Sequence, residues 1–233
     1  MKEVVIFYGI RRSGNHGIIN LIKQQNKNFV HMNNLRTLSY EQYEEQKNNP
    51  ISKRNIDIHY TGSKGSDLTI LSLENKIPDE LEIKKFQDLE ETRCVFLIRN
   101  PFNNLASVWK FYKSVQMLHE YIELWNFYFN LFNSPNSSYI YIVYDKFYQN
   151  LEYREKKLKE IGVSKECAEK FLDDSRGYAH SSWGPKSGAD LKNGRPSVFD
   201  RYKLFKEDKV FNDICMNNKQ LNINWGVINE SKI

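Results

Sequence analysis

The sequence predicts an α/β fold of three layers, in which a central parallel sheet is flanked by helices on both faces. Three observations lead to this prediction. Short apolar segments recur along the chain and are typical of strands buried on both faces of a parallel sheet. Segments with the apolar spacing of helices separate these strands. The length of 233 residues, with 40% hydrophobic side chains, fits one domain spanning residues 1–233.

A strand–loop–helix unit is expected at the start of the chain. The run Val4–Tyr8 is apolar throughout, which indicates a buried strand. In the next segment, Gly9–Gly14, two glycines frame four residues, and this segment reads as a loop. The segment Asn15–Gln25 carries isoleucine and leucine at helical spacing, so we expect a helix there.

The region that follows is more polar and has weaker signals. Residues 32–55 read as a surface stretch with a short helix at Tyr40–Gln46. A short strand is expected at Asp57–Thr61 and a stronger one at Leu68–Leu73. The charged residues 78–92 predict a helix and a connection.

Two further buried strands are expected at Cys94–Ile98 and Tyr139–Tyr144. The first ends at Arg99-Asn100-Pro101, and proline suits the first turn of the next helix because its missing N–H would be unpaired there anyway. The remaining expectations are helices up to Tyr112 and at 117–132, 151–161, 164–173 and 199–217, with a long loop rich in Gly, Ser and Pro at 177–197.

Charge and cysteine usage narrow the possible functions. The net charge of +5 suits an enzyme for a polyanionic small molecule, and no run of Lys and Arg is long enough for a nucleic-acid arm. Three widely spaced cysteines without a CxxC pair argue against a metal or redox site. The sequence shows no signal peptide and no stretch of the ~20 apolar residues that span a bilayer. These features favour a cytoplasmic protein without a membrane anchor.

The loop at Gly9–Gly14 has the composition of an anion site. Backbone N–H groups in such a turn bind phosphate together with the helix N-terminus, and Arg12 and Ser13 add a charge and a hydroxyl. This pattern predicts a P-loop type of nucleotide-binding fold. Nucleoside triphosphatases need Lys and then Ser or Thr after the last glycine, but Asn15 and His16 stand here, which disfavours ATP or GTP hydrolysis. A tight turn with solvent-facing arginines is the alternative.

A second motif is more specific. Arg99 ends a strand, and Ser107 lies two turns into the next helix. Together the two loops resemble the sulfotransferase family, whose donor is 3′-phosphoadenosine-5′-phosphosulfate (PAPS). The family's first loop reads roughly Pro-Lys/Arg-Ser-Gly-Thr-Thr/Asn, which Arg12-Ser13-Gly14-Asn15 matches at its core. Its second element reads Arg-Asn/Asp-Pro with Ser eight residues after the Arg. The strand Ile140–Asp145 resembles the family's strand ending in Tyr-Glu-Asp, and Ile161-Gly162 fits the Leu-Gly that usually ends its next helix. The resemblance spans about residues 4–162.

This resemblance implies transfer of a sulfuryl group from PAPS to an acceptor hydroxyl or amine, with adenosine 3′,5′-bisphosphate (PAP) as the product and no metal. Arg12 would neutralise the departing 5′-phosphate, and Arg99 and Ser107 would hold the 3′-phosphate. Tyr144 would contact the adenine, with a core aromatic as the alternative. The other loop residues that would line the donor site are Arg11, Ser13, Gly14, Asn15 and His16.

The resemblance also places a catalytic base on the strand end that precedes the Arg-Asn-Pro strand. Glu74 falls about where the cytosolic branch has the His of Lys-Thr-His-Leu-Pro, and Ser72 replaces its Lys. A solvated carboxylate is the alternative for Glu74, and His59 is a second candidate base. Lys192 and Arg195 loosely match the family's late segment that contacts the 3′-phosphate.

Two other functions stay open from the residues alone. A nucleotide or nucleoside kinase with an altered loop would use Asp145 to hold magnesium. A non-catalytic module would bind the nucleotide without a base. For a sulfotransferase, the expected acceptor is a carbohydrate or a small molecule, held by the segments 32–66, 113–130 and 176–197. No nucleic-acid partner is expected, and the sequence does not indicate an oligomeric state.

Overall fold

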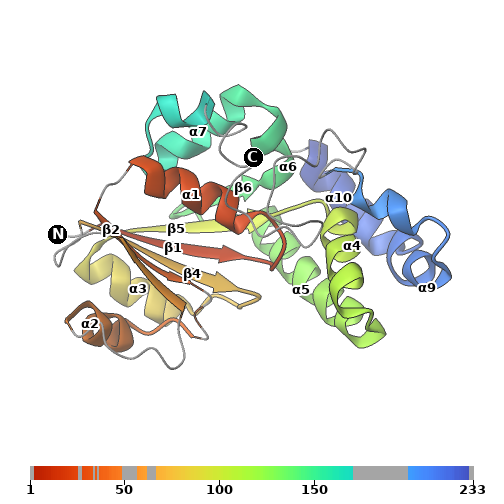
Figure 1. Ribbon diagram of the computed structural model, residues 1–233, viewed down its shortest axis with the longest axis horizontal. Helices are drawn as coiled ribbons and strands as arrows, with labels where there is room; N and C mark the ends of the chain where they lie inside the picture. Colours follow the sequence, from red (N-terminus) through yellow and green to blue (C-terminus); the bar gives the residue numbers. More distant parts are fainter. Residues whose placement is uncertain are drawn as a thin grey trace.

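A computed structural model describes residues 3–25, 28–33, 35, 37–48, 57–61, 67–169 and 199–230, with backbone only at 46–48 and 57–61. Its strands form one six-stranded sheet in the order β3-β2-β4-β1-β5-β6. Figure 1 shows helices packed on both faces of this sheet. The predicted α/β architecture is therefore confirmed.

The four strands β4, β1, β5 and β6 are parallel neighbours whose carboxyl ends lie at one edge of the sheet. In the central strand β1 (Glu3–Gly9), Gly9 pairs in register with Glu74 of β4 (Leu68–Glu74). On its other side Gly9 pairs with Leu97 of β5 (Glu91–Ile98), which in turn pairs with β6 (Tyr139–Val143). The loops that follow these strands consequently start side by side, where ligands of such sheets bind.

The other edge of the sheet differs from the prediction in two ways. The strand β2 (Phe29–Asn33) pairs parallel with β4, although no strand was expected there. The edge strand β3 (Asp57–Thr61) was expected, but it runs antiparallel to β2. The sheet is thus mixed at this edge, because the apolar pattern of a short strand does not encode its direction.

Two hydrophobic clusters cover the two faces of the sheet, one on each. On one face, α1 (Asn15–Gln25) and α7 (Leu151–Ile161) pack over Val5 and Phe7. On the other face, Val4, Ile6 and Tyr8 contact a larger, aromatic-rich cluster. The helices of this second layer are α2 (Tyr40–Asn48), α3 (Glu80–Leu89), α4 (Pro101–Tyr112), α5 (Val115–Asn133) and α10 (Lys219–Glu230). In Figure 1 the arrowheads of the strands end beside α4 and α5.

The C-terminal part and the end of β6 differ from the expected elements. Residues 199–217 were predicted as one helix, but they form the 3₁₀ turn η2 (Arg201–Phe205), the short α9 (Lys209–Phe211) and the π-helical η3 (Asn212–Met216). The helix α10 was not anticipated. Tyr144 was expected to end a strand, whereas it is the first residue of the short helix α6 (Tyr144–Gln149).

Candidate functional site

The loop between β1 and α1 depends on its two glycines. A Cβ on Gly9 would lie 2.1 Å from Oδ1 of Asn15, whose side chain folds back over the loop. Gly14 has a φ of +98°, and a Cβ there would lie 2.1 Å from the ring of Tyr144. Arg12 also has a positive φ, of 72°. The loop is therefore a tight, partly strained turn at the N-terminus of a helix, which is a suitable place for an anion.

Glu74 lies at the end of β4, within a cluster of hydrogen-bond donors from the loop. Its Oε2 accepts from Nε of Arg11 at 3.1 Å, and its Oε1 accepts from Nδ2 of Asn15 at 3.2 Å. The Nε2 of His16 lies 3.8 Å from Oε1. The Glu74 side chain is only 10% exposed. The structure thus brings together three predicted loop residues and the predicted base.

Arg11 joins this carboxylate to two tyrosines on α4 and α5. Its backbone N–H donates to Oδ1 of Asn75 at 2.7 Å, and its Nη1 donates to the hydroxyl of Tyr112 at 3.1 Å. The Nδ2 of Asn75 donates to the hydroxyl of Tyr121 at 2.7 Å. Burial raises the pKa of Tyr121 to about 12, so this phenol is neutral at physiological pH. The side of the site next to Glu74 is consequently lined by polar, uncharged groups and one arginine.

Arg12 and Arg99 meet on the other side of the loop. The Nη1 of Arg99 donates to the backbone oxygen of Arg12 at 3.0 Å, and its guanidinium lies 5.2 Å from the ring centroid of Tyr144. The Arg12 guanidinium lies 5.0 Å from the ring centroid of Phe111. Arg99 is 2% exposed, and its backbone oxygen accepts from the indole of Trp125 at 2.9 Å. The two arginine-bearing loops therefore form one group at neighbouring strand ends.

Ser107 lies next to an arginine that the sequence reasoning missed. The Ser107 hydroxyl is fully buried, donates to the backbone oxygen of Asn103 at 3.0 Å, and accepts from Nη1 of Arg201 at 3.3 Å. Burial lowers the pKa of Arg201, and the nearby positive charges of Arg99 and Arg12 lower it further. No motif in the sequence marks Arg201, because it is 94 residues away from Ser107.

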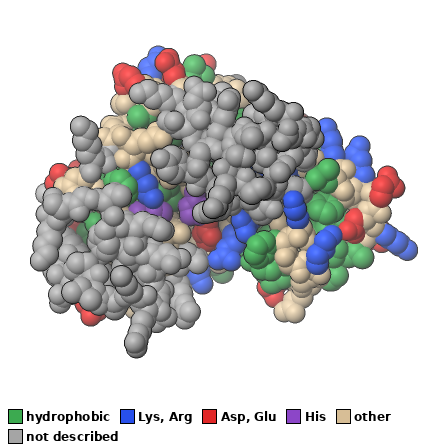
Figure 2. Space-filling model, viewed as in Figure 1, with side chains coloured by type: hydrophobic (Ala, Val, Ile, Leu, Met, Phe, Trp, Pro, Cys, Tyr) green, Lys and Arg blue, Asp and Glu red, His purple; other side chains and the backbone are tan. Residues whose placement is uncertain are grey.

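Positive charge is concentrated where Arg12, Arg99 and Arg201 come together. Their mutual repulsion is what depresses the Arg201 pKa beyond the effect of burial. The Nε of Arg12 is buried and has no hydrogen-bond partner among the described residues. In Figure 2, Lys and Arg side chains gather in the middle of the face, between the sheet and α4. A bound polyanion would relieve this repulsion, so the geometry is that of an anion site.

Asp145 is engaged in a structural contact. It is 7% exposed, and its Oδ2 accepts from the backbone N–H of Asn100 at 2.7 Å, just before α4. Burial raises the pKa of this carboxyl, while Arg99 opposes the rise. A kinase would need this carboxylate for magnesium, whereas here it accepts the hydrogen bond from Asn100. The described residues contain no group of three or more His, Cys, Asp or Glu arranged to hold a metal.

The backbone of His59, the second candidate base, lies away from Glu74. In the register of the sheet, His59 pairs with His31, and His31 pairs with Ile70, four residues before Glu74. With ~3.3 Å per residue and ~4.8 Å per strand, the backbone of His59 is roughly 16 Å from that of Glu74. Lys192 and Arg195, as well as the segment 176–197, lie outside the described residues.

Ser72, the residue in place of the family's lysine, is part of a buried polar chain. Its hydroxyl donates to Oδ1 of Asn33 at 2.8 Å, and Nε2 of His31 lies 3.1 Å from Oγ of Ser72. These contacts link the ends of β2 and β4, two residues before Glu74 along β4. Sequence reasoning did not anticipate His31, because a single histidine in a polar stretch carries no pattern.

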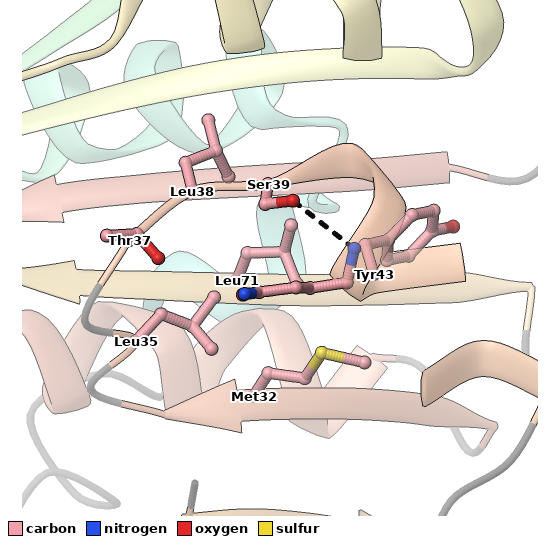
Figure 3. Close-up of a pocket in the computed structure, with 8 residues that line it drawn as sticks. Met32, Leu35, Thr37, Leu38, Ser39, Tyr43 and Leu71 are labelled. Carbon is pink, nitrogen blue, oxygen red and sulfur yellow. Dashed lines mark hydrogen bonds between the residues drawn. The ribbon is translucent and has the colours of Figure 1, made fainter. Parts of the chain in front are cut away.

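A small pocket lies under α2, apart from this cluster. Figure 3 shows that Met32, Leu35, Leu38 and Leu71 line it with Tyr43. Side chains alternate along β4, so Leu71 points to the sheet face opposite that of Ser72 and Glu74. The pocket is therefore part of the packing of α2 and not of the arginine site.

No described helix combines the length and the apolar character needed to cross a membrane.

Comparisons with known proteins agree with the fold. The chain is similar to the crystal structure of mouse sulfotransferase SULT7A1 complexed with PAP, with a TM-score of 0.53 and 12% identity, covering 99% of this chain and 90% of that one. Weaker similarities are to retinol dehydratase in complex with androsterone and inactive cofactor PAP (TM-score 0.45, 11% identity, 93% and 83% covered), and to a sulfotransferase from Alicyclobacillus acidocaldarius (0.39, 10%, 71% and 83%). No protein-family model and no curated protein sequence matches the chain. The chain thus has a sulfotransferase-like fold, and at this identity the similarity establishes the fold alone.

Proposed function

We propose that this protein is a sulfotransferase that moves a sulfuryl group from PAPS to a hydroxyl or amine of an acceptor. The observation that carries the proposal is the contact between the two arginine loops. Arg99 reaches the backbone of the Gly9–Gly14 loop at 3.0 Å, so two basic loops adjoin at the ends of β1 and β5. One nucleotide with two separate phosphates is the ligand that such a pair of loops fits.

The residues divide into two subsites for the donor. In this proposal the loop from Arg12 to Asn15 and the N-terminus of α1 bind the 5′-phosphosulfate. The 3′-phosphate binds to Arg99, Ser107 and Arg201. Nη1 of Arg201 lies 3.3 Å from Oγ of Ser107, and Arg99 is close enough to lower the pKa of Arg201. The ring centroid of Tyr144 lies 5.2 Å from the Arg99 guanidinium, and we propose that the adenine or ribose packs near this ring.

The chemistry follows from these positions. Sulfuryl transfer needs an aligned acceptor, a stabilised leaving phosphate and removal of one proton from the acceptor. Arg12 would stabilise the negative charge that develops on the 5′-phosphate. Glu74 would accept the acceptor's proton after its hydrogen bonds from Arg11 and Asn15 rearrange. Because Asn75, Tyr112 and Tyr121 are neighbours of Glu74, we expect a polar acceptor such as a carbohydrate or a small hydroxylated molecule.

A ligand panel tests the proposal. PAP should raise the melting temperature and bind measurably in calorimetry, because it occupies both subsites and stabilises the folded state by mass action. ATP with magnesium should do so far less, because the loop lacks the Lys and Ser/Thr of triphosphatases. Incubation with labelled PAPS and a panel of sugars, phenols and amines would then identify the acceptor class. Equal stabilisation by PAP and by magnesium-ATP would count against a sulfotransferase and in favour of a kinase.

A further inference from the structure

We propose that two consecutive side chains on α4, Asn103 and Asn104, are positioning residues that hold the two phosphate subsites independently. Asn104 fixes the Gly9–Gly14 loop, and Asn103 fixes the segment 199–201 that carries Arg201. This inference rests on the proposed function, because it assigns each asparagine to one phosphate of the same nucleotide.

Asn104 contacts the loop at two points. Its side chain is fully buried, and its Nδ2 donates to the backbone oxygen of Arg11 at 2.8 Å and to Oγ of Ser13 at 3.3 Å. Because Ser13 Oγ accepts this bond, its own proton is directed elsewhere and is available to an anion in the loop. The Oδ1 of Asn104 is buried with no hydrogen-bond partner in the described part of the chain. A buried, half-satisfied amide costs stability, which suggests that it is kept for what its Nδ2 holds.

Asn103 makes the corresponding contacts to the C-terminal segment. It is 1% exposed, its Nδ2 donates to the backbone oxygen of Phe199 at 2.8 Å, and its Oδ1 accepts from the backbone N–H of Arg201 at 3.0 Å. Both ends of the amide are used on residues that are two apart. This fixes the backbone from which Arg201 reaches Ser107, one turn further along the same helix.

The geometry of the helix explains the division of roles. Consecutive residues of an α-helix point about 100° apart, so Asn103 faces the segment 199–201 and Asn104 faces the loop after β1. The same helix also carries Ser107 and follows Arg99. The N-terminal half of α4 therefore aligns two segments that are nearly 190 residues apart in the sequence.

Calorimetry with three nucleotides tests the proposal. Adenosine 5′-monophosphate (5′-AMP) occupies only the loop subsite, adenosine 3′-monophosphate (3′-AMP) only the other, and PAP both. Asn104→Ala should weaken the binding of 5′-AMP about 5- to 20-fold, the loss expected for one or two positioning hydrogen bonds. The affinity for 3′-AMP should stay within about twofold. Asn103→Ala should do the reverse. Both variants should bind PAP more weakly than the unaltered protein does.

A matched control is available on α10. Asn224 is also a buried asparagine, and its Nδ2 donates to Oδ1 of Asn126 on α5 at 3.0 Å, away from the loop. Asn224→Ala should lower the melting temperature without changing the affinity for any of the three nucleotides. Should either alanine variant fail to fold, Asn103→Ser and Asn104→Ser keep a polar group at the position and still remove the contacts.

The outcomes separate the two levels of the argument. Two results would overturn the positioning roles and leave the proposed function standing. One is an equal loss of affinity for 5′-AMP and for 3′-AMP in both variants, and the other is a loss of affinity no larger than that of Asn224→Ala. Failure of the unaltered protein to bind PAP or either monophosphate would overturn the proposed function and this inference with it.

Discussion

Glu74 is the residue whose role is easiest to isolate, because its carboxylate has defined partners. Glu74→Gln keeps the volume and an oxygen that can accept from Arg11, but it removes the proton acceptor. We expect kcat for sulfuryl transfer to fall by about 10²- to 10⁴-fold, the usual contribution of a general base. The affinity for PAP, measured by calorimetry, should stay within about twofold.

A matched control separates loss of the base from a general effect of replacing a carboxylate. The matched control is Glu82→Gln on α3, whose carboxylate accepts from the backbone of Tyr40 and from Lys85, away from the arginine site. If Glu74→Gln turns over as fast as Glu82→Gln, Glu74 is not the base.

Asp145 gives a prediction that depends on pH. Its pKa is raised in the folded protein, chiefly by burial, so ionisation of this carboxyl costs folding free energy. That cost is absent below the pKa of the unfolded chain and complete above the pKa of the folded one. Asp145→Asn keeps an oxygen for the Asn100 N–H and removes the charge. We therefore expect a higher melting temperature than that of the unaltered protein at pH 7–8, and a difference that vanishes as the pH falls below about 4.

The same substitution should strengthen the binding of PAP, because it removes a negative charge that acts on Arg99. Thermal unfolding at several pH values, with and without PAP, measures both effects. A stabilisation that is equal at pH 4 and pH 8 would show that the charge of Asp145 is not its cause.

At the scale of single elements, the strands with the clearest sequence signal are those whose side chains are apolar throughout. The runs at Val4–Tyr8 and Cys94–Ile98 have no polar residue, and both became central strands. The strand β2 was missed because it contains His31 and Asn33, whose polar side chains contact Ser72 of the neighbouring strand. A local pattern does not reveal a polar side chain whose hydrogen-bond partner is 40 residues away.

The same limit applies to the loops of the site. The Gly9–Gly14 and Arg99–Pro101 segments were found because their residues form local motifs beside strands. Tyr144 was placed at a strand end, but the chain turns into α6 there, and the Tyr144 ring packs where a side chain on Gly14 would lie. This contact between α6 and the first loop is tertiary, so no local signal could predict it.

At the scale of the whole molecule, the proposed donor site joins three distant parts of the chain. The first loop, the start of α4 and the residues just before η2 meet at the carboxyl edge of the sheet. Three guanidinium groups are held together there although they repel one another, which costs folding free energy. A protein keeps such a cluster when a bound anion offsets the cost, so nucleotide binding should stabilise the C-terminal part as well as the loop.

Arg201 provides the last test, because it is the contribution of the C-terminal part to the site. Arg201→Ala removes a charge-assisted hydrogen-bond donor, worth about 1.5–3 kcal/mol, so PAP and 3′-AMP should bind about 10- to 100-fold more weakly. The affinity for 5′-AMP should change much less. Arg201→Lys should restore part of the binding, since lysine keeps the charge but not the planar fork of donors. The control is Lys203→Ala on the same turn, whose ammonium group pairs with Asp200. Calorimetry at two salt concentrations should show a shallower salt dependence for Arg201→Ala than for the control, and unchanged 3′-AMP affinity in Arg201→Ala would remove Arg201 from the site.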